Sequence, residues 1–264
     1  PITDAISSVE SMTDIILDNN LLGMQTTVWL PQRYLTDTIN FALAYSAELS
    51  WSGKEKSKNE FAQAFIKSYF GMDPTNELVH TFWNLHNLAM SKEEIVSRMW
   101  NSSEAMDSLS TQESTSPAMN MRERARGVIN ALNRSRERVK KNQTEYESLI
   151  LAAQVSEHIN NRAVSAYLIT FEIRTAHRQL KSINPKSAIV NYKNAINIID
   201  NLIEAEKNII NRVENNWDRW RYSEPDRLKN CSPENILYLL YNKDGYLMEL
   251  KAKLSEDLSK IESN

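Results

Sequence analysis

Residues 119–182 read MNMRERARGVINALNRSRERVKKNQTEYESLILAAQVSEHINNRAVSAYLITFEIRTAHRQLKS, and this stretch decides the fold. It contains no proline and one glycine, and its apolar residues recur about every 3.6 positions. These apolar positions are Val128, Leu132, Val139, Tyr146, Leu149, Ala153, Ile159, Ala163, Tyr167 and Phe171. The spacing predicts one long helix, about 90 Å if unbroken at 1.5 Å per residue.

Two more long helices are predicted after this one. Asn184 precedes Pro185 and ends the first helix, because the residue before a proline disfavours helical geometry. A second helix is predicted over 186–221. A third has Pro233 at its first position, where proline is favoured, and runs to about residue 262. Three long helices joined by short turns predict an antiparallel bundle.

Shorter helices are predicted before the bundle, at 3–19, 34–50, 57–70, 75–90 and 91–100. Ser57 with Glu60 has the spacing of a capping box, and Gly71 is placed to end the same helix. Ser91 with Glu94 repeats the capping pattern.

A stretch rich in serine and threonine separates the two helical regions and predicts a linker. We therefore expect a smaller helical region at 1–102, a linker at 103–118 and a long-helix bundle at 119–264.

Residues 24–30, MQTTVWL, lie between Gly23 and Pro31 and are the one stretch with strand character. An isolated strand leaves its backbone groups unsatisfied, so this segment needs partner strands that the rest of the sequence does not offer. The predicted fold class is all-α, with a single short strand-like segment before the bundle.

Composition excludes several classes of function. Five glycines in 264 residues leave little room for phosphate-binding loops, and no P-loop, dinucleotide fingerprint or nucleophile elbow occurs. A single cysteine, Cys231, excludes an intrachain disulfide and a cysteine-based zinc cluster. The net charge of -3 and the short apolar runs predict neither a nucleic-acid nor a membrane partner. No cofactor is expected.

The histidines do not form a metal-binding pattern. Glu77 and His80 form an E-x-x-H unit, but di-iron bundles use this unit twice and here it occurs once. We therefore expect no metal site and interpret His80, His86, His158 and His177 as packing or surface residues.

Two further sets of residues can be interpreted either as ordinary structural residues or as binding surfaces. The arginine-rich run 122–141 is interpreted as a solvated helix face, with a nucleic-acid surface as the weaker alternative. Trp217 and Trp220 form an i, i+3 pair that is interpreted as core packing rather than as an aromatic platform for a sugar.

One resemblance explains the orphan strand. The sequence from Gly23 to Trp29, followed by INFALAYSAELSW at 39–51, resembles the end of a family 20-like glycoside hydrolase barrel, the class of the β-N-acetylhexosaminidases. In that family a closing barrel strand ends in tryptophan and is followed by a helix with a similar Ala-Glu-x-x-Trp ending. The resemblance covers roughly residues 15–75 and implies that the partner strands lie in an upstream barrel domain.

The resemblance also implies roles for particular positions. Trp29 matches the tryptophan that lines the sugar pocket, while Pro31 stands where the family often has an acidic residue that binds sugar hydroxyls. The family's catalytic Asp-Glu pair lies on an earlier strand, and no Asp-Glu dipeptide occurs in this sequence. We therefore expect no catalytic residue here, Trp29 as a substrate contact, and a supporting role beside the barrel.

Two hypotheses follow for the chain as a whole. The first is a non-catalytic C-terminal helical portion of a glycoside hydrolase, with the upstream barrel as its partner and a homodimer through the long helices as a further expectation. The second is a free-standing helical interaction or adaptor protein, whose long helices present a surface to a partner.

Overall fold

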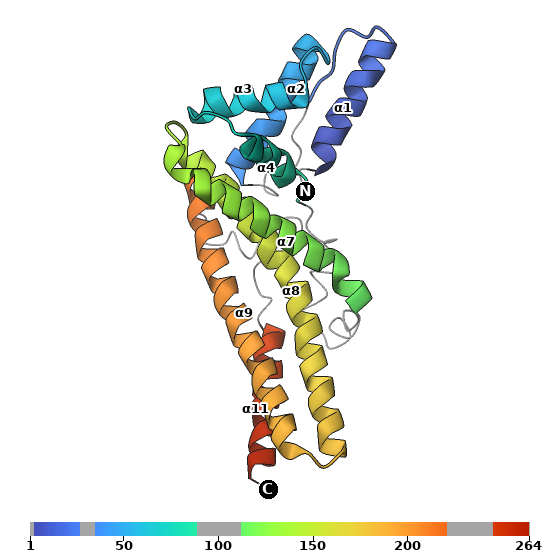
Figure 1. Ribbon diagram of the computed structural model, residues 1–264, viewed down its shortest axis with the longest axis vertical. Coiled ribbons are helices and arrows are strands. Elements are labelled where there is room, and N and C mark those ends of the chain that lie inside the picture. The colour runs from blue at the N-terminus through green and yellow to red at the C-terminus, as the bar shows by residue number, and fades with distance from the viewer. Residues whose placement is uncertain (1–2, 27–34, 89–111, 221–244, 264) are drawn as a thin grey trace. The chain divides into compact units, whose positions relative to one another are not determined.

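The computed structural model describes residues 3–26, 35–88, 112–220 and 245–263 (Figure 1). Within these ranges all regular structure is helical and no strand is formed, which confirms the predicted all-α fold. None of the helices in the described ranges is both long enough and apolar enough to span a bilayer.

The chain divides into two compact units, each assembled from separate segments of sequence. Unit 1 comprises Pro1–Ala89, Glu123–Glu157 and Asn215–Tyr222, and unit 2 comprises Met90–Arg122, His158–Glu214 and Ser223–Asn264. Three helices contribute residues to both units: α7 (Gln112–Ser135), α8 (Gln143–Lys181) and α9 (Pro185–Trp220).

The predicted linker at 103–118 is wrong over its last part. Residues 112–118 form the first turns of α7, with Pro117 inside the helix. Pro117 is the sixth residue of α7, beyond the first turn, so it removes one backbone hydrogen bond from the helix. Residues 103–111 lie outside the described ranges.

Unit 1 begins with α1 (Thr3–Asp18), η2 (Thr36–Ile39), α2 (Asn40–Ser52), α3 (Lys58–Phe70) and α4 (Asn76–His86). These elements confirm the predicted helices at 3–19, 34–50 and 57–70, whereas α4 ends before residue 90. The Tyr45 hydroxyl of α2 donates to Glu10 of α1 at 2.8 Å and fixes this pair of helices together. The predicted helix at 91–100 lies outside the described residues.

The ends of α3 follow the sequence signals. The backbone N–H of Ser57 donates to the Glu60 carboxylate at 2.9 Å, and the Glu60 N–H donates to the Ser57 hydroxyl at 3.3 Å, which completes the predicted capping box. Gly71 ends the helix in the left-handed region, at φ 66°.

Aromatic rings fill the core of unit 1. Phe41 lies at the centre, with its ring centroid 5.1 Å from that of Phe65, 5.5 Å from that of Phe82 and 4.9 Å from that of Trp83. Most of these contacts are tilted or edge-on, the arrangement that the ring quadrupoles favour. The packing holds α2, α3 and α4 against one another.

The single long helix predicted over 119–182 is wrong, because the chain turns between α7 and α8. Val139 is extended and Asn142 has a φ of 48°, so the helix cannot continue through them. The Lys140 and Lys141 N–H groups both donate to the carbonyl of Phe70, at 3.0 and 3.1 Å, which gives the last turn of α3 its hydrogen-bond partners. We call residues 136–142 the α7–α8 corner.

Beyond this corner α7 and α8 form an antiparallel helical hairpin in unit 1. The Tyr146 hydroxyl donates to the Leu132 carbonyl at 3.0 Å, and Arg126 pairs with Glu157 at 2.7 Å. Both contacts join a residue of α7 to a residue of α8. The pair that lies farther from the turn, Arg126 and Glu157, is also farther apart in sequence, as an antiparallel arrangement requires.

Unit 2 contains parts of α8 and α9 together with α11 (Gly245–Glu262), which lie side by side in Figure 1. Small residues line the contact and allow close approach of the helices, among them Ala166, Ala176 and Ala195. Leu247 and Leu254 complete this core from α11. The long helices predicted at 186–221 and up to about 262 are confirmed where the structure describes them.

The strand-like segment is described only at its beginning. Residues 24–26 have no regular secondary structure, and 27–30 lie outside the described ranges. The Thr26 and Ser46 hydroxyls are hydrogen bonded and link this segment to α2.

Candidate functional site

The sugar-contact position taken from the resemblance, Trp29, lies outside the described residues. The side chains of Trp217 and Trp220 are also outside the described part, although their backbone belongs to α9. The role of Trp29 and the packing of the tryptophan pair therefore remain predictions.

The two residues of the E-x-x-H unit on α4 have different surroundings. Glu77 forms an ion pair with Arg134 of α7, and His80 is exposed. Among the described residues no group of histidine, cysteine and carboxylate side chains is placed to hold a metal ion.

His86 on the same helix is fully buried. Its ring stacks on that of Phe41, with a centroid distance of 4.8 Å and an interplanar angle of 9°. Neither ring nitrogen has a hydrogen-bond partner in the described part of the chain, and burial lowers the pKa of His86 to about 3. The residue is a neutral packing group, as the sequence predicted.

Three polar side chains form a buried cluster inside unit 2. His158 and Arg162 are four residues apart on α8, so they share a face, and Glu206 of α9 lies opposite them. The Arg162 Nε donates to Glu206 Oε2 at 2.9 Å, and a guanidinium nitrogen forms an ion pair with Oε1. His158 Nε2 is hydrogen bonded to the same carboxylate.

Electrostatics fix the protonation of this cluster. Burial, together with the nearby Arg162 charge, lowers the pKa of His158 to about 3, so its Nε2 donates as a neutral imidazole. Burial lowers the pKa of Arg162 to about 9, which leaves the guanidinium charged at neutral pH. The side chains expose between 1 and 8% of their surface, and the cluster joins α8 to α9 without access for a substrate.

The arginine-rich run 122–141 is largely paired within the protein. Arg126 contacts Glu123 and Glu157, and Arg136 contacts Glu147 at 2.5 Å. Arg138 donates to the carbonyl of Asp73. Pairing neutralises much of the positive field that a nucleic-acid surface requires, which favours the interpretation as a solvated helix face.

Arg136 and Glu147 also line a surface cavity of about 440 Å³ at the α7–α8 corner. Gln143, Thr144 and the buried Tyr146 add to its lining. Opposite charges on its walls cancel, so the cavity offers no net charge to a ligand.

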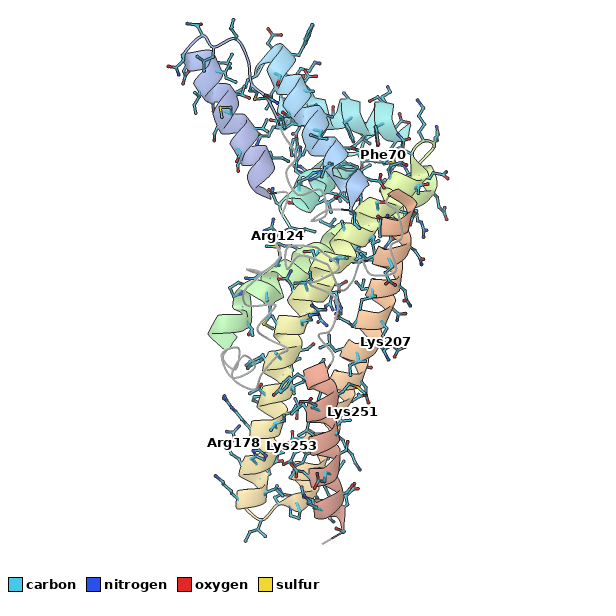
Figure 2. All side chains as sticks on the ribbon, turned by 180° about the vertical axis from the view of Figure 1, so that it is seen from behind. Phe70, Arg124, Arg178, Lys207, Lys251 and Lys253 are labelled. Carbon is cyan, nitrogen blue, oxygen red and sulfur yellow. The ribbon has the colours of Figure 1, made fainter. Side chains whose placement is uncertain are left out.

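The last third of α8, in unit 2, carries a more distinctive feature. A groove of about 500 Å³ follows this part of the helix, and Figure 2 shows one of its cations, Arg178, on α8. Its described lining consists of Phe171, Arg174, His177, Arg178 and Lys181. We call this set the α8 groove.

The lining residues of the α8 groove share one face of the helix. Positions 171, 174, 178 and 181 follow an i, i+3, i+7, i+10 pattern. The Arg178 guanidinium donates to the Thr175 hydroxyl at 3.2 Å, which orients it along the helix. Phe171 exposes 49% of its surface, and its ring centroid lies 6.4 Å from that of Tyr167.

Sequence reasoning missed both the buried cluster and the α8 groove. The i, i+4 pair of His158 and Arg162 was a usable signal, but nothing in the pattern identified Glu206 as its partner. The groove residues have a visible helical spacing, but only Phe171 was identified as one of the apolar positions of the long helix.

Comparisons with protein families, with curated proteins and with solved structures found no match.

Proposed function

We propose that this chain is a non-catalytic helical portion of a carbohydrate-active glycoside hydrolase similar to the N-acetylhexosaminidases, with a supporting role beside the catalytic barrel. The observation that carries the proposal is the apolar surface of α1. Met12, Ile15 and Leu17 each expose about half of their surface, and Leu21 and Leu22 after the helix are exposed as well.

Large apolar side chains gathered on one short helix are costly in water, at roughly 25 cal/mol per Å². A contiguous apolar patch on a protein surface is typical of a face that another protein part covers. Met12 and Ile15 are three residues apart and lie on the same side of α1. In the proposed parent protein the covering part is the barrel domain, because the resemblance makes α1 and α2 its last helices.

The coding sequence on the 5′ side of the Pro1 codon tests this proposal. A continuous reading frame that encodes alternating strands and helices with an Asp-Glu pair supports it. An initiator methionine directly before Pro1 contradicts it.

Activity gives a second test. The isolated chain should not hydrolyse a chromogenic N-acetyl-β-glucosaminide, because it contains no Asp-Glu pair. In the parent enzyme Trp29→Ala should raise KM if the tryptophan contacts the sugar, with Trp51→Ala as an exposed control of the same residue type. Measurable turnover by the isolated chain would contradict the non-catalytic role.

A second candidate function is a free-standing helical interaction or adaptor protein. The α8 groove favours it, because the exposed Phe171 lies beside the cations Arg178 and Lys181, a combination that suits contact with a partner protein. An initiator methionine before Pro1, together with partner binding at this groove, would favour this candidate over the first.

A further inference from the structure

We draw no further inference here: the strongest candidate, the exposed apolar surface patch of Leu21, Leu22 and Trp51 at the C-terminal ends of α1 and α2, continues the apolar surface already described on α1, and nothing in the described part of the structure shows which further partner covers it.

Discussion

Arg162 of α8 and Glu206 of α9 form an ion pair in the interior of unit 2, with side chains that expose 1 and 8% of their surface. His158 donates a further hydrogen bond to the same carboxylate while it remains neutral. A buried carboxylate with a charged and a neutral donor is well satisfied, but it depends strongly on both.

Replacing Arg162 alone should therefore destabilise the protein severely. Arg162→Met leaves Glu206 buried without its countercharge, and we expect unfolding free energy in urea to fall by roughly 3–5 kcal/mol. The double variant Arg162→Met/Glu206→Leu should recover most of that loss, because it removes both charges. Arg178→Met on the exposed face of α8 should change stability by less than about 0.5 kcal/mol. Equal losses in the single and double variants would contradict this account.

Stability should fall in acid because of His86. Burial lowers its pKa from 6.5 to about 3, so the unfolded chain binds the proton more readily than the folded protein. The contribution of His86 is complete above pH 6.5 and is lost as the pH falls towards 3, at up to about 1.4 kcal/mol per pH unit.

The variant His86→Phe isolates this effect. It keeps a ring against Phe41 and removes the titrating group without breaking a hydrogen bond known in the described structure. Between pH 5 and 7 the unfolding free energy of this variant should depend less steeply on pH than that of the wild type, and the difference in slope should correspond to at most one bound proton. His158 should contribute to the pH dependence in both proteins. If denaturation series at several pH values give the same slope for both proteins, His86 does not titrate as argued.

Two glycines should respond to alanine in opposite directions. Gly71 has a φ of 66°, and an added Cβ would lie 3.2 Å from the Lys141 side chain, so Gly71→Ala should cost at least about 1 kcal/mol. Gly127 lies inside α7, where a Cβ would meet no atom within 4 Å, so Gly127→Ala should stabilise the protein by about 0.5–1 kcal/mol. Thermal denaturation of both variants checks the difference, and a loss of Tm in Gly127→Ala would contradict it.

The sequence predicted the parts of the fold that depend on local chemistry. The capping box of Ser57 and Glu60 and the stop at Gly71 act within a few residues of each other, so their pattern is visible in the chain. Pro185 marked the start of α9 for the same reason.

The α7–α8 corner could not be predicted in this way. Neither proline nor glycine marks it, and its geometry depends on hydrogen bonds to the carbonyl groups of Tyr69 and Phe70 far earlier in the sequence. Helical periodicity continues across the turn, because apolar residues on both sides serve the same core. A tertiary contact there overrides a local preference for helix.

The buried cluster and the α8 groove were missed for different physical reasons. Glu206 acquires its role only through the packing of α9 on α8, which periodicity does not specify. Phe171 continues the apolar pattern of α8 but is half exposed, because a pattern reports spacing along a helix and not which neighbour covers it.

The composition of unit 1 from three separate segments has a consequence for biosynthesis. The ring of Phe70 packs against Tyr146, 5.2 Å away between centroids, and Asn216 donates to the hydroxyl of Ser148 at 2.7 Å. During synthesis α1 to α4 emerge from the ribosome long before these later residues are translated. Unit 1 therefore reaches its native state only after residue 216 has been translated, and until then its first helices expose aromatic surface to chaperones.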